Sequence, residues 1–249
     1  MALSHREVLG IAGAGAALAI GLVVVPPVAQ DPRYHAFADA RTIAGVPNFW
    51  NVATNAAFVV AALWGLRALG SRTAFAERWE RAAYAALMAG TALAGVGSTY
   101  YHLNPTDTRL LWDRLPMTVV FMSLLAATAG ERMSGGAGKR LLVPLLLLGL
   151  GSVVYWAAAG DLRLYGLVQF GAMLAVPLLL LLRPPRYTGT GAVWGMAALY
   201  AVAKAAELMD RRMVAVVATG GHPWKHVAAA GAILWYGNGV ARRRVLAQG

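Results

Sequence analysis

The chain has 249 residues, of which 59% are hydrophobic and only 13% are charged, so it is too apolar for an ordinary soluble domain. It contains no cysteine, which excludes a disulfide framework and leaves histidine, carboxylate and water as the ligands for any transition metal. The net charge of +11 does not require a nucleic-acid partner, because the arginines lie in short loops between apolar runs, as topology signals do. The composition therefore indicates an integral membrane protein.

The first apolar run covers residues 8–28. We expect a retained transmembrane helix rather than a cleaved signal peptide, because the run is long and the following Pro-Pro-Val-Ala-Gln sequence is a poor cleavage site. Residues 29–48 are polar and contain prolines, which predicts a loop or a surface-lying segment.

Further apolar runs follow, each near the length of about 20 residues that a bilayer requires. They cover residues 49–69, 81–102, 113–130, 140–158, 163–182, 190–209 and 222–241. The prediction is an all-α integral membrane protein with a seven-helix transmembrane core and one additional N-terminal transmembrane helix.

Basic residues predict the orientation of these helices. With both termini in the cytoplasm, thirteen arginines and lysines lie on the cytoplasmic side and seven on the other. His102 and His222 then fall on the outer side. The many alanines and arginines and the compact loops are typical of a bacterial inner membrane.

Histidines and one carboxylate collect at predicted helix ends on this outer side. His222 and His226 are four residues apart, so both imidazoles project from one helix face and can hold one metal ion. His102 ends an earlier run, and Asp113 begins the next one. A single interfacial histidine is usually a surface residue and an aspartate at a helix start is usually a cap. Three histidines on one side, however, match the ligand set of an open zinc site.

Small and polar residues share the helix face of His102. Ser98 lies one turn before it, and Ala94 and Gly90 continue the same face inward. This face predicts either a close helix contact or space for a lipid chain below a polar site.

Three motifs in order resemble the alkaline ceramidase family. They are Ser98-x-x-x-His102, Asp113-Arg-Leu-Pro-Met117 and His222-Pro-Trp-Lys-His226, and Phe49-Trp-Asn-Val-Ala-Thr-Asn55 is similar to the family's opening-helix motif. The family belongs to a superfamily of seven-helix membrane hydrolases that also contains the adiponectin and progestin receptors. The resemblance covers residues 39–241. It implies an extra helix and loop in residues 1–38 and a ceramidase-like domain in residues 39–249.

The resemblance also implies an active site. His102, His222 and His226 would bind Zn²⁺, and Ser98 and Asp113 would complete the site of a hydrolase that cleaves the amide bond of ceramide or a related N-acyl lipid. A zinc-activated water would attack the amide, with Asp113 as general acid and base. Ser98 would either stabilise the oxyanion or orient the water.

The sequence departs from the family at a second cation site. Eukaryotic members have a glutamate before Phe-Trp-Asn and acidic residues upstream, which bind calcium. Asn48 replaces that glutamate here, and only Asp31 and Asp39 remain upstream, which argues against a bound calcium ion. Asp39 is still expected to tie its loop to the core.

Other polar residues are candidates for supporting roles. Asn48, Asn51 and Asn55 share one face and would contact the histidines, the headgroup or a neighbouring helix.

Two lysines and a glutamate form another set. Lys204 and Glu207 are spaced to form an ion pair, with headgroup recognition as the alternative. Lys225 lies on another face of its helix from the two histidines and is predicted to extend to the membrane interface.

Two other functions remain open from the sequence. The first is a lipid-binding receptor or scaffold with a structural zinc, but such a clamp needs neither Ser98 nor Asp113. The second is a retinal-type photoreceptor with a Schiff base on Lys204 or Lys225. The expected partners are a ceramide-like membrane lipid and the bilayer.

Overall fold

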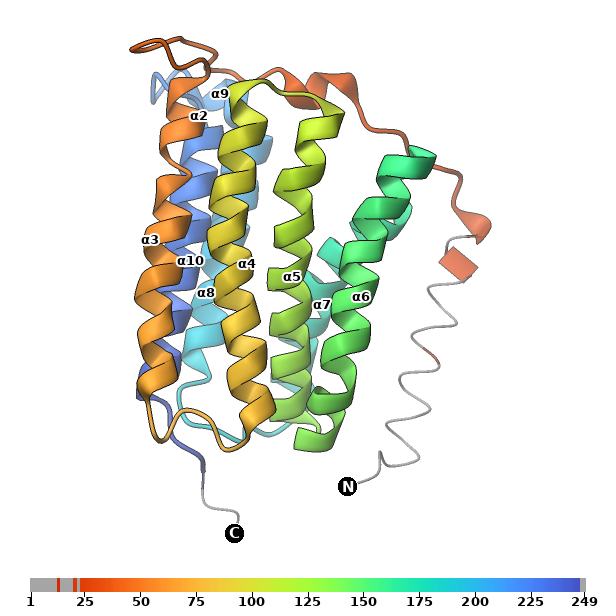
Figure 1. Ribbon diagram of the computed structural model, residues 1–249, viewed down its shortest axis with the longest axis vertical. Coiled ribbons are helices and arrows are strands. Elements are labelled where there is room, and N and C mark those ends of the chain that lie inside the picture. The colour runs from red at the N-terminus through yellow and green to blue at the C-terminus, as the bar shows by residue number, and fades with distance from the viewer. Residues whose placement is uncertain (1–12, 14–19, 22, 247–249) are drawn as a thin grey trace.

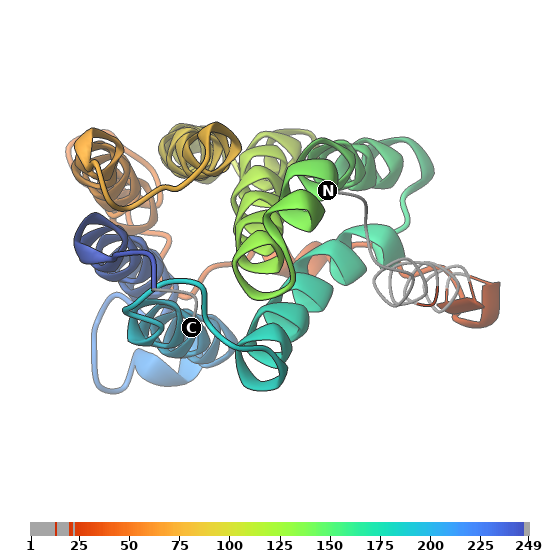
Figure 2. The ribbon, with the colours of Figure 1, turned by 90° about the horizontal axis from the view of Figure 1, so that it is seen from below.

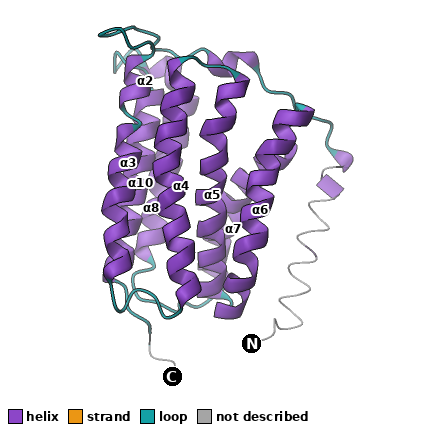
Figure 3. Cartoon of the chain, in the orientation of Figure 1, coloured by secondary structure: helices purple, strands orange, loops and turns teal. Residues whose placement is uncertain are grey.

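The computed structural model describes residue 13, residues 20 and 21, and residues 23–246. Within these residues the chain is helical, without a strand beyond isolated bridges (Figure 3). The α-helices are α2 (Phe49–Ala53), α3 (Ala56–Leu66), α4 (Arg78–Leu103), α5 (Asp107–Arg132), α6 (Gly135–Ala159), α7 (Arg163–Leu182), α8 (Gly191–Leu208), α9 (Asp210–Met213) and α10 (His222–Arg242). Two short 3-10 helices are η1 (Pro32–His35) and η2 (Arg67–Gly70). Most of the predicted first helix, 8–28, lies outside the described residues.

The long helices run side by side in one bundle (Figures 1 and 2). Helix α4 packs against α3 and α5, α5 packs against α6 and α7, and α10 packs against α3 and α8. Five segments are long and apolar enough to cross a membrane: Phe49–Gly70, Arg78–Leu103, Asp107–Arg132, Gly135–Ala159 and Arg163–Leu182. These spans support a multi-pass membrane protein. Helices α8 and α10 are less apolar because they carry Lys204, Glu207, His222 and Lys225.

Each of the seven apolar runs after residue 48 coincides with helical structure, but the first is interrupted. Helix α2 ends at Ala53 and α3 begins at Ala56. The Thr54 hydroxyl donates to the Trp50 backbone carbonyl at 2.7 Å, and the Asn55 side-chain amide donates to the Asn51 backbone carbonyl at 2.8 Å. Such side chains compete with the backbone for helix hydrogen bonds, which explains the break.

Small residues set the distance between α4 and α5. A Cβ atom added to Gly97 would lie 2.0 Å from the Trp112 carbonyl oxygen, and one added to Gly90 would lie 3.0 Å from the Pro116 carbonyl oxygen. Gly90 therefore serves a close helix contact, whereas Ala94 lines a cavity. The close helix contact is therefore confirmed at Gly90, and the space for a lipid chain stays a prediction at Ala94.

The end of the bundle away from the histidines is held by ion pairs. Arg243 pairs with Glu131 at 3.2 Å, and Arg186 pairs with Glu80 at 3.1 Å. The Tyr187 hydroxyl donates to Glu80 at 2.6 Å. Contacts with a tyrosine and an arginine thus satisfy a buried glutamate, which fixes the loop after α7 to the start of α4.

Candidate active site

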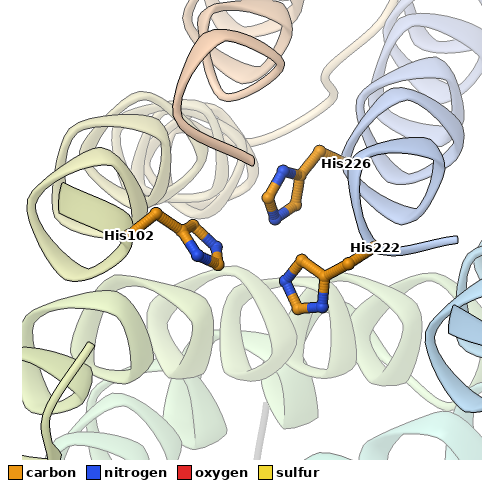
Figure 4. A group of neighbouring side chains, drawn as sticks. All are labelled: His102, His222 and His226. Atoms are coloured by element: carbon orange, nitrogen blue, oxygen red, sulfur yellow. The ribbon is translucent and has the colours of Figure 1, made fainter. Parts of the chain in front are cut away.

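The structure brings His102, His222 and His226 together at one end of the bundle (Figure 4). His102 lies in the last turn of α4, and the other two lie in the first turns of α10. Their ring centroids form a nearly equilateral triangle with sides of 4.9, 5.0 and 5.0 Å. All three side chains are buried, with exposures of 1%, 5% and 1%.

The nitrogens of this triangle fit a metal ion. His102 Nδ1, His222 Nε2 and His226 Nε2 are buried and lack a hydrogen-bond partner. The three residues offer ligand atoms within 4.8 Å of one another. A buried polar atom without a partner is costly, and three neighbouring histidines that each carry such a nitrogen are typical of a site that a ligand completes. Neutral imidazole nitrogens are also the donors that Zn²⁺ prefers in the absence of cysteine.

Thr54, at the break between α2 and α3, orients His226. Its hydroxyl lies 2.9 Å from His226 Nδ1 and already donates its hydrogen to Trp50. It can therefore only accept from His226, which places the proton on Nδ1 and leaves the lone pair on Nε2. Sequence reasoning missed Thr54, although it lies within the quoted Phe-Trp-Asn-Val-Ala-Thr-Asn motif.

Asp210 holds the start of α10. Its carboxylate accepts from the backbone N–H groups of Gly221 and His222, both at 2.8 Å, and from Ala38 at 2.9 Å. A carboxylate at a helix start satisfies free N–H groups and interacts favourably with the helix dipole. The same residue therefore fixes His222 and the loop near Ala38, a role that the sequence did not reveal.

Phe37, in the loop fixed by Asp210, covers the histidines. Its ring centroid lies 4.7 Å from that of His102 and 4.6 Å from that of His222. The loop thus closes the outer end of the histidine triangle with an apolar ring, which excludes water from that side.

Ser98 and Asp113 lie beside the triangle on α4 and α5. Both are buried, at 4% and 7% exposure, and Ser98 hydrogen-bonds the Asp113 side chain. They line a cavity of about 1410 Å³, together with His226. Most of its wall is apolar and comes from α4, α5, α7, α8 and α10. The arrangement joins polar groups to a space suited to an acyl chain.

The three asparagines bind backbone carbonyls rather than imidazole rings. Asn48 donates to the His102 carbonyl at 2.9 Å, Asn51 to the Asp39 carbonyl at 3.2 Å, and Asn55 to the Asn51 carbonyl. Asn48 thus links the start of α2 to the end of α4, next to a histidine of the triangle.

Lys204 and Glu207 form the predicted ion pair. Lys225 also binds Glu207, with Nζ 2.5 Å from Oε1, and all three side chains line the cavity. The prediction that Lys225 extends to the membrane interface is therefore wrong. The glutamate on α8 attracts the ammonium group into the bundle, where the pair reduces the cost of burying each charge.

Asp39 pairs with its neighbour Arg41. The carboxylate accepts from Arg41 Nε at 2.8 Å and Nη2 at 2.7 Å, and these bonds lower the pKa of Asp39. Arg41 also donates to the Ala218 carbonyl at 3.1 Å. Together with the bond from Asn51, these contacts connect the loop to the core. Asp31 is engaged with Arg33 at 2.9 Å.

A family model described as Ceramidase matches residues 41–236. The chain belongs to the ceramidase family. The matched range includes all three histidines of the triangle, Ser98 and Asp113. Ceramidase membership supports a hydrolase that acts on amide bonds. No curated protein sequence matches the chain.

Proposed function

We propose that the protein is a zinc-dependent intramembrane hydrolase that cleaves the amide bond of ceramide or a related N-acyl lipid. The observation that carries this proposal is a group of three buried histidines, each with a partnerless imidazole nitrogen and with ligand atoms within 4.8 Å of one another, beside Ser98 and Asp113 at the polar end of an apolar cavity. Membership of the ceramidase family supports the same reaction class.

His102, His222 and His226 would hold the metal. Bound there, Zn²⁺ would supply Lewis acidity and would lower the pKa of a water molecule toward about 7. The chain contributes the positions of the three nitrogens, because Thr54 and Asp210 orient His226 and His222.

Asp113 would move the protons of the reaction. Its carboxylate accepts a proton from the attacking water and then delivers one to the leaving nitrogen. The water oxygen bonds to the carbonyl carbon, the C–N bond breaks, and the products are a fatty acid and an amine. Ser98 donates to the Asp113 carboxylate in the structure. Once Asp113 has accepted the water proton, the Ser98 hydroxyl would turn and donate its single hydrogen to the carbonyl oxygen as negative charge develops there.

The apolar part of the cavity would hold the acyl chain. Phe170 of α7 lines the cavity and is also 56% exposed, so the cavity reaches the outer surface of the bundle at this helix. A lipid would enter there from the bilayer without crossing water.

We also propose that α8 and α10 cross the membrane, because they run alongside the five apolar spans (Figure 1). This gives the seven-helix ceramidase-like domain over residues 39–249, preceded by one more helix and a loop in residues 1–38. The distribution of arginine and lysine supports cytoplasmic termini.

The test combines metal content with turnover in detergent-purified protein. We expect one zinc per chain in the wild type, release of fatty acid from a fluorescent ceramide, and loss of both in His222→Ala. Asp113→Asn should retain zinc but lose about 10²- to 10⁴-fold in rate. Asp107→Asn, on the same helix but outside the cavity lining, is the matched control.

Two outcomes would contradict the proposal. Wild-type protein without metal would reject the metal site, and an Asp113→Asn variant with full activity would reject the role of Asp113. Zinc without hydrolysis of any N-acyl lipid would favour the receptor or scaffold with a structural metal.

A further inference from the structure

The polar end of the cavity carries more positive than negative side chains. Seven charged residues line the cavity, and two of them, Asp31 and Arg163, form ion pairs with Arg33 and Asp161. We define the cationic end by the other five: Arg114, Lys204, Lys225, Asp113 and Glu207. Three are cations and two are carboxylates, so the set has a net charge of +1 with the histidines neutral. Charges inside a membrane protein are costly and usually serve a ligand or a proton path.

Glu207 is shared between two lysines. Its Oε2 binds Lys204 and its Oε1 binds Lys225, so one carboxylate faces two ammonium groups. Each ammonium has three N–H donors. The group therefore keeps one positive charge and spare donors on the cavity wall.

Arg114 has no carboxylate partner among the described residues. It is 5% exposed, and Nη2 donates to the Gln30 side chain at 2.7 Å. Its guanidinium carbon lies 4.2 Å from the ring centroid of Trp156 and 4.7 Å from that of Tyr165. Nη1 is buried and lacks a hydrogen-bond partner. The aromatic rings hold the guanidinium in place, but they do not satisfy this donor.

The position of these cations indicates which part of a lipid they would meet. Arg114 follows Asp113 directly on α5, and Asp113 lies within electrostatic range of both Arg114 and Lys225. An amide that reacts beside Asp113 would extend its acyl chain into the apolar part of the cavity. The amine half of the substrate would then lie against the cationic end.

We propose that the amine half of the substrate carries an anionic group, a carboxylate or a phosphate, that binds Arg114 and Lys225. This inference rests on the proposed amidase function and narrows its substrate class. A guanidinium with a free donor suits planar carboxylates and phosphates, and a bound anion would neutralise the excess charge. A neutral lipid would leave both the donor and the charge without a partner.

The test compares substrates that differ only in charge. N-palmitoylglycine and its neutral amide, N-palmitoylglycinamide, form one pair, and ceramide 1-phosphate and ceramide form the other. We expect kcat/KM of the wild type to favour the anionic member of at least one pair by about 10- to 100-fold, the range for a charged hydrogen bond. The pair that shows this preference distinguishes a carboxylate from a phosphate. Faster hydrolysis of the neutral member in both pairs would overturn the inference.

A variant then assigns the preference to Arg114. Arg114→Gln should raise KM for the anionic lipid about tenfold and leave the neutral lipid nearly unchanged. Arg109→Gln, on the same helix but outside the cavity lining, is the control. An equal loss for both lipids would show that Arg114 only supports the structure.

Binding separates this inference from the proposed function. Tryptophan fluorescence of the purified protein, titrated with N-palmitoylglycine and its amide, reports affinity without turnover. Preferential binding of the anionic lipid without hydrolysis of any lipid would retain the anion site and reject the amidase. Hydrolysis of neutral lipids without this preference would retain the amidase and reject the anion site.

Discussion

Replacement of Thr54 by valine tests whether the Thr54 hydroxyl, at the break between α2 and α3, fixes the tautomer of His226. Valine is close in size to threonine but has a methyl group in place of the hydroxyl. The hydroxyl accepts from His226 Nδ1 at 2.9 Å while it donates to the Trp50 carbonyl at 2.7 Å. Without it, the Nδ1 proton loses its side-chain acceptor and the ring keeps only its contact with the Asn51 backbone, so the ring can turn its lone pair away from the triangle.

The expected effect is a loss of zinc affinity. Removal of a group that orients a metal-binding histidine costs about 10- to 100-fold in affinity, or about 1.4–2.7 kcal/mol. Thr54→Ser keeps the hydroxyl and should bind zinc like the wild type. Competition with a chelator of known zinc affinity, in detergent, measures both dissociation constants.

Equal zinc affinity of Thr54→Val and Thr54→Ser would refute the reasoning. The melting temperatures of both metal-free variants must be compared as well, because a general loss of folding would also weaken zinc binding. Weaker binding by the valine variant at an unchanged melting temperature isolates the hydrogen bond to His226.

Three further changes test the surrounding structure. Gly97→Ala should lower the free energy of unfolding by about 1–3 kcal/mol, because the added Cβ would meet the backbone of α5. Gly151→Ala is the control and should leave the free energy of unfolding unchanged, because its Cβ would meet nothing within 4 Å. Thermal melting of the two variants in detergent measures the difference. Asp210→Ala should weaken zinc binding about tenfold in the same chelator competition, because three N–H groups at the start of α10 and in the covering loop lose their acceptor. The pKa of Asp161 is lowered chiefly by its arginine neighbour, so its stabilisation is complete above the unfolded pKa of about 3.9 and is lost as pH falls through the lowered value. The melting difference between wild type and Asp161→Asn should therefore shrink on acidification below pH about 4, and a constant difference would contradict this assignment.

The positions of the helices and the grouping of the histidines could be predicted from the sequence. Apolar runs of bilayer length locate the helices, and the spacing of His222 and His226 places two imidazoles on one face. His102 ends its run at the same side of the bundle, so the triangle follows once the helices pack side by side.

Contacts between distant residues could not be predicted in this way. Thr54 and His226 are 172 residues apart, and no local pattern relates a hydroxyl at the break between α2 and α3 to a ring on α10. Lys225 illustrates the same limit, because helix periodicity gives its face but not the glutamate on α8 that attracts it. The break at Thr54 was missed because an apolar run does not report side chains that bond backbone carbonyls.

The distribution of unsatisfied polar atoms shows where the molecule is built to receive a ligand. Eight buried side-chain atoms among the described residues lack a hydrogen-bond partner. Six of them belong to residues at the histidine end of the bundle: Asn51, Asn55, His102, Arg114, His222 and His226. The charged residues at the opposite end, by contrast, include the ion pairs of Arg243 with Glu131 and of Arg186 with Glu80.

This difference between the two ends has a physical consequence. Unsatisfied polar groups are most costly in a membrane, where lipid offers them no replacement for water. Their concentration at one end therefore favours partners that the chain itself does not supply. A metal ion would satisfy the imidazoles, and an anionic lipid headgroup would satisfy Arg114, so the same argument from unpaired atoms supports both the metal centre and the substrate class.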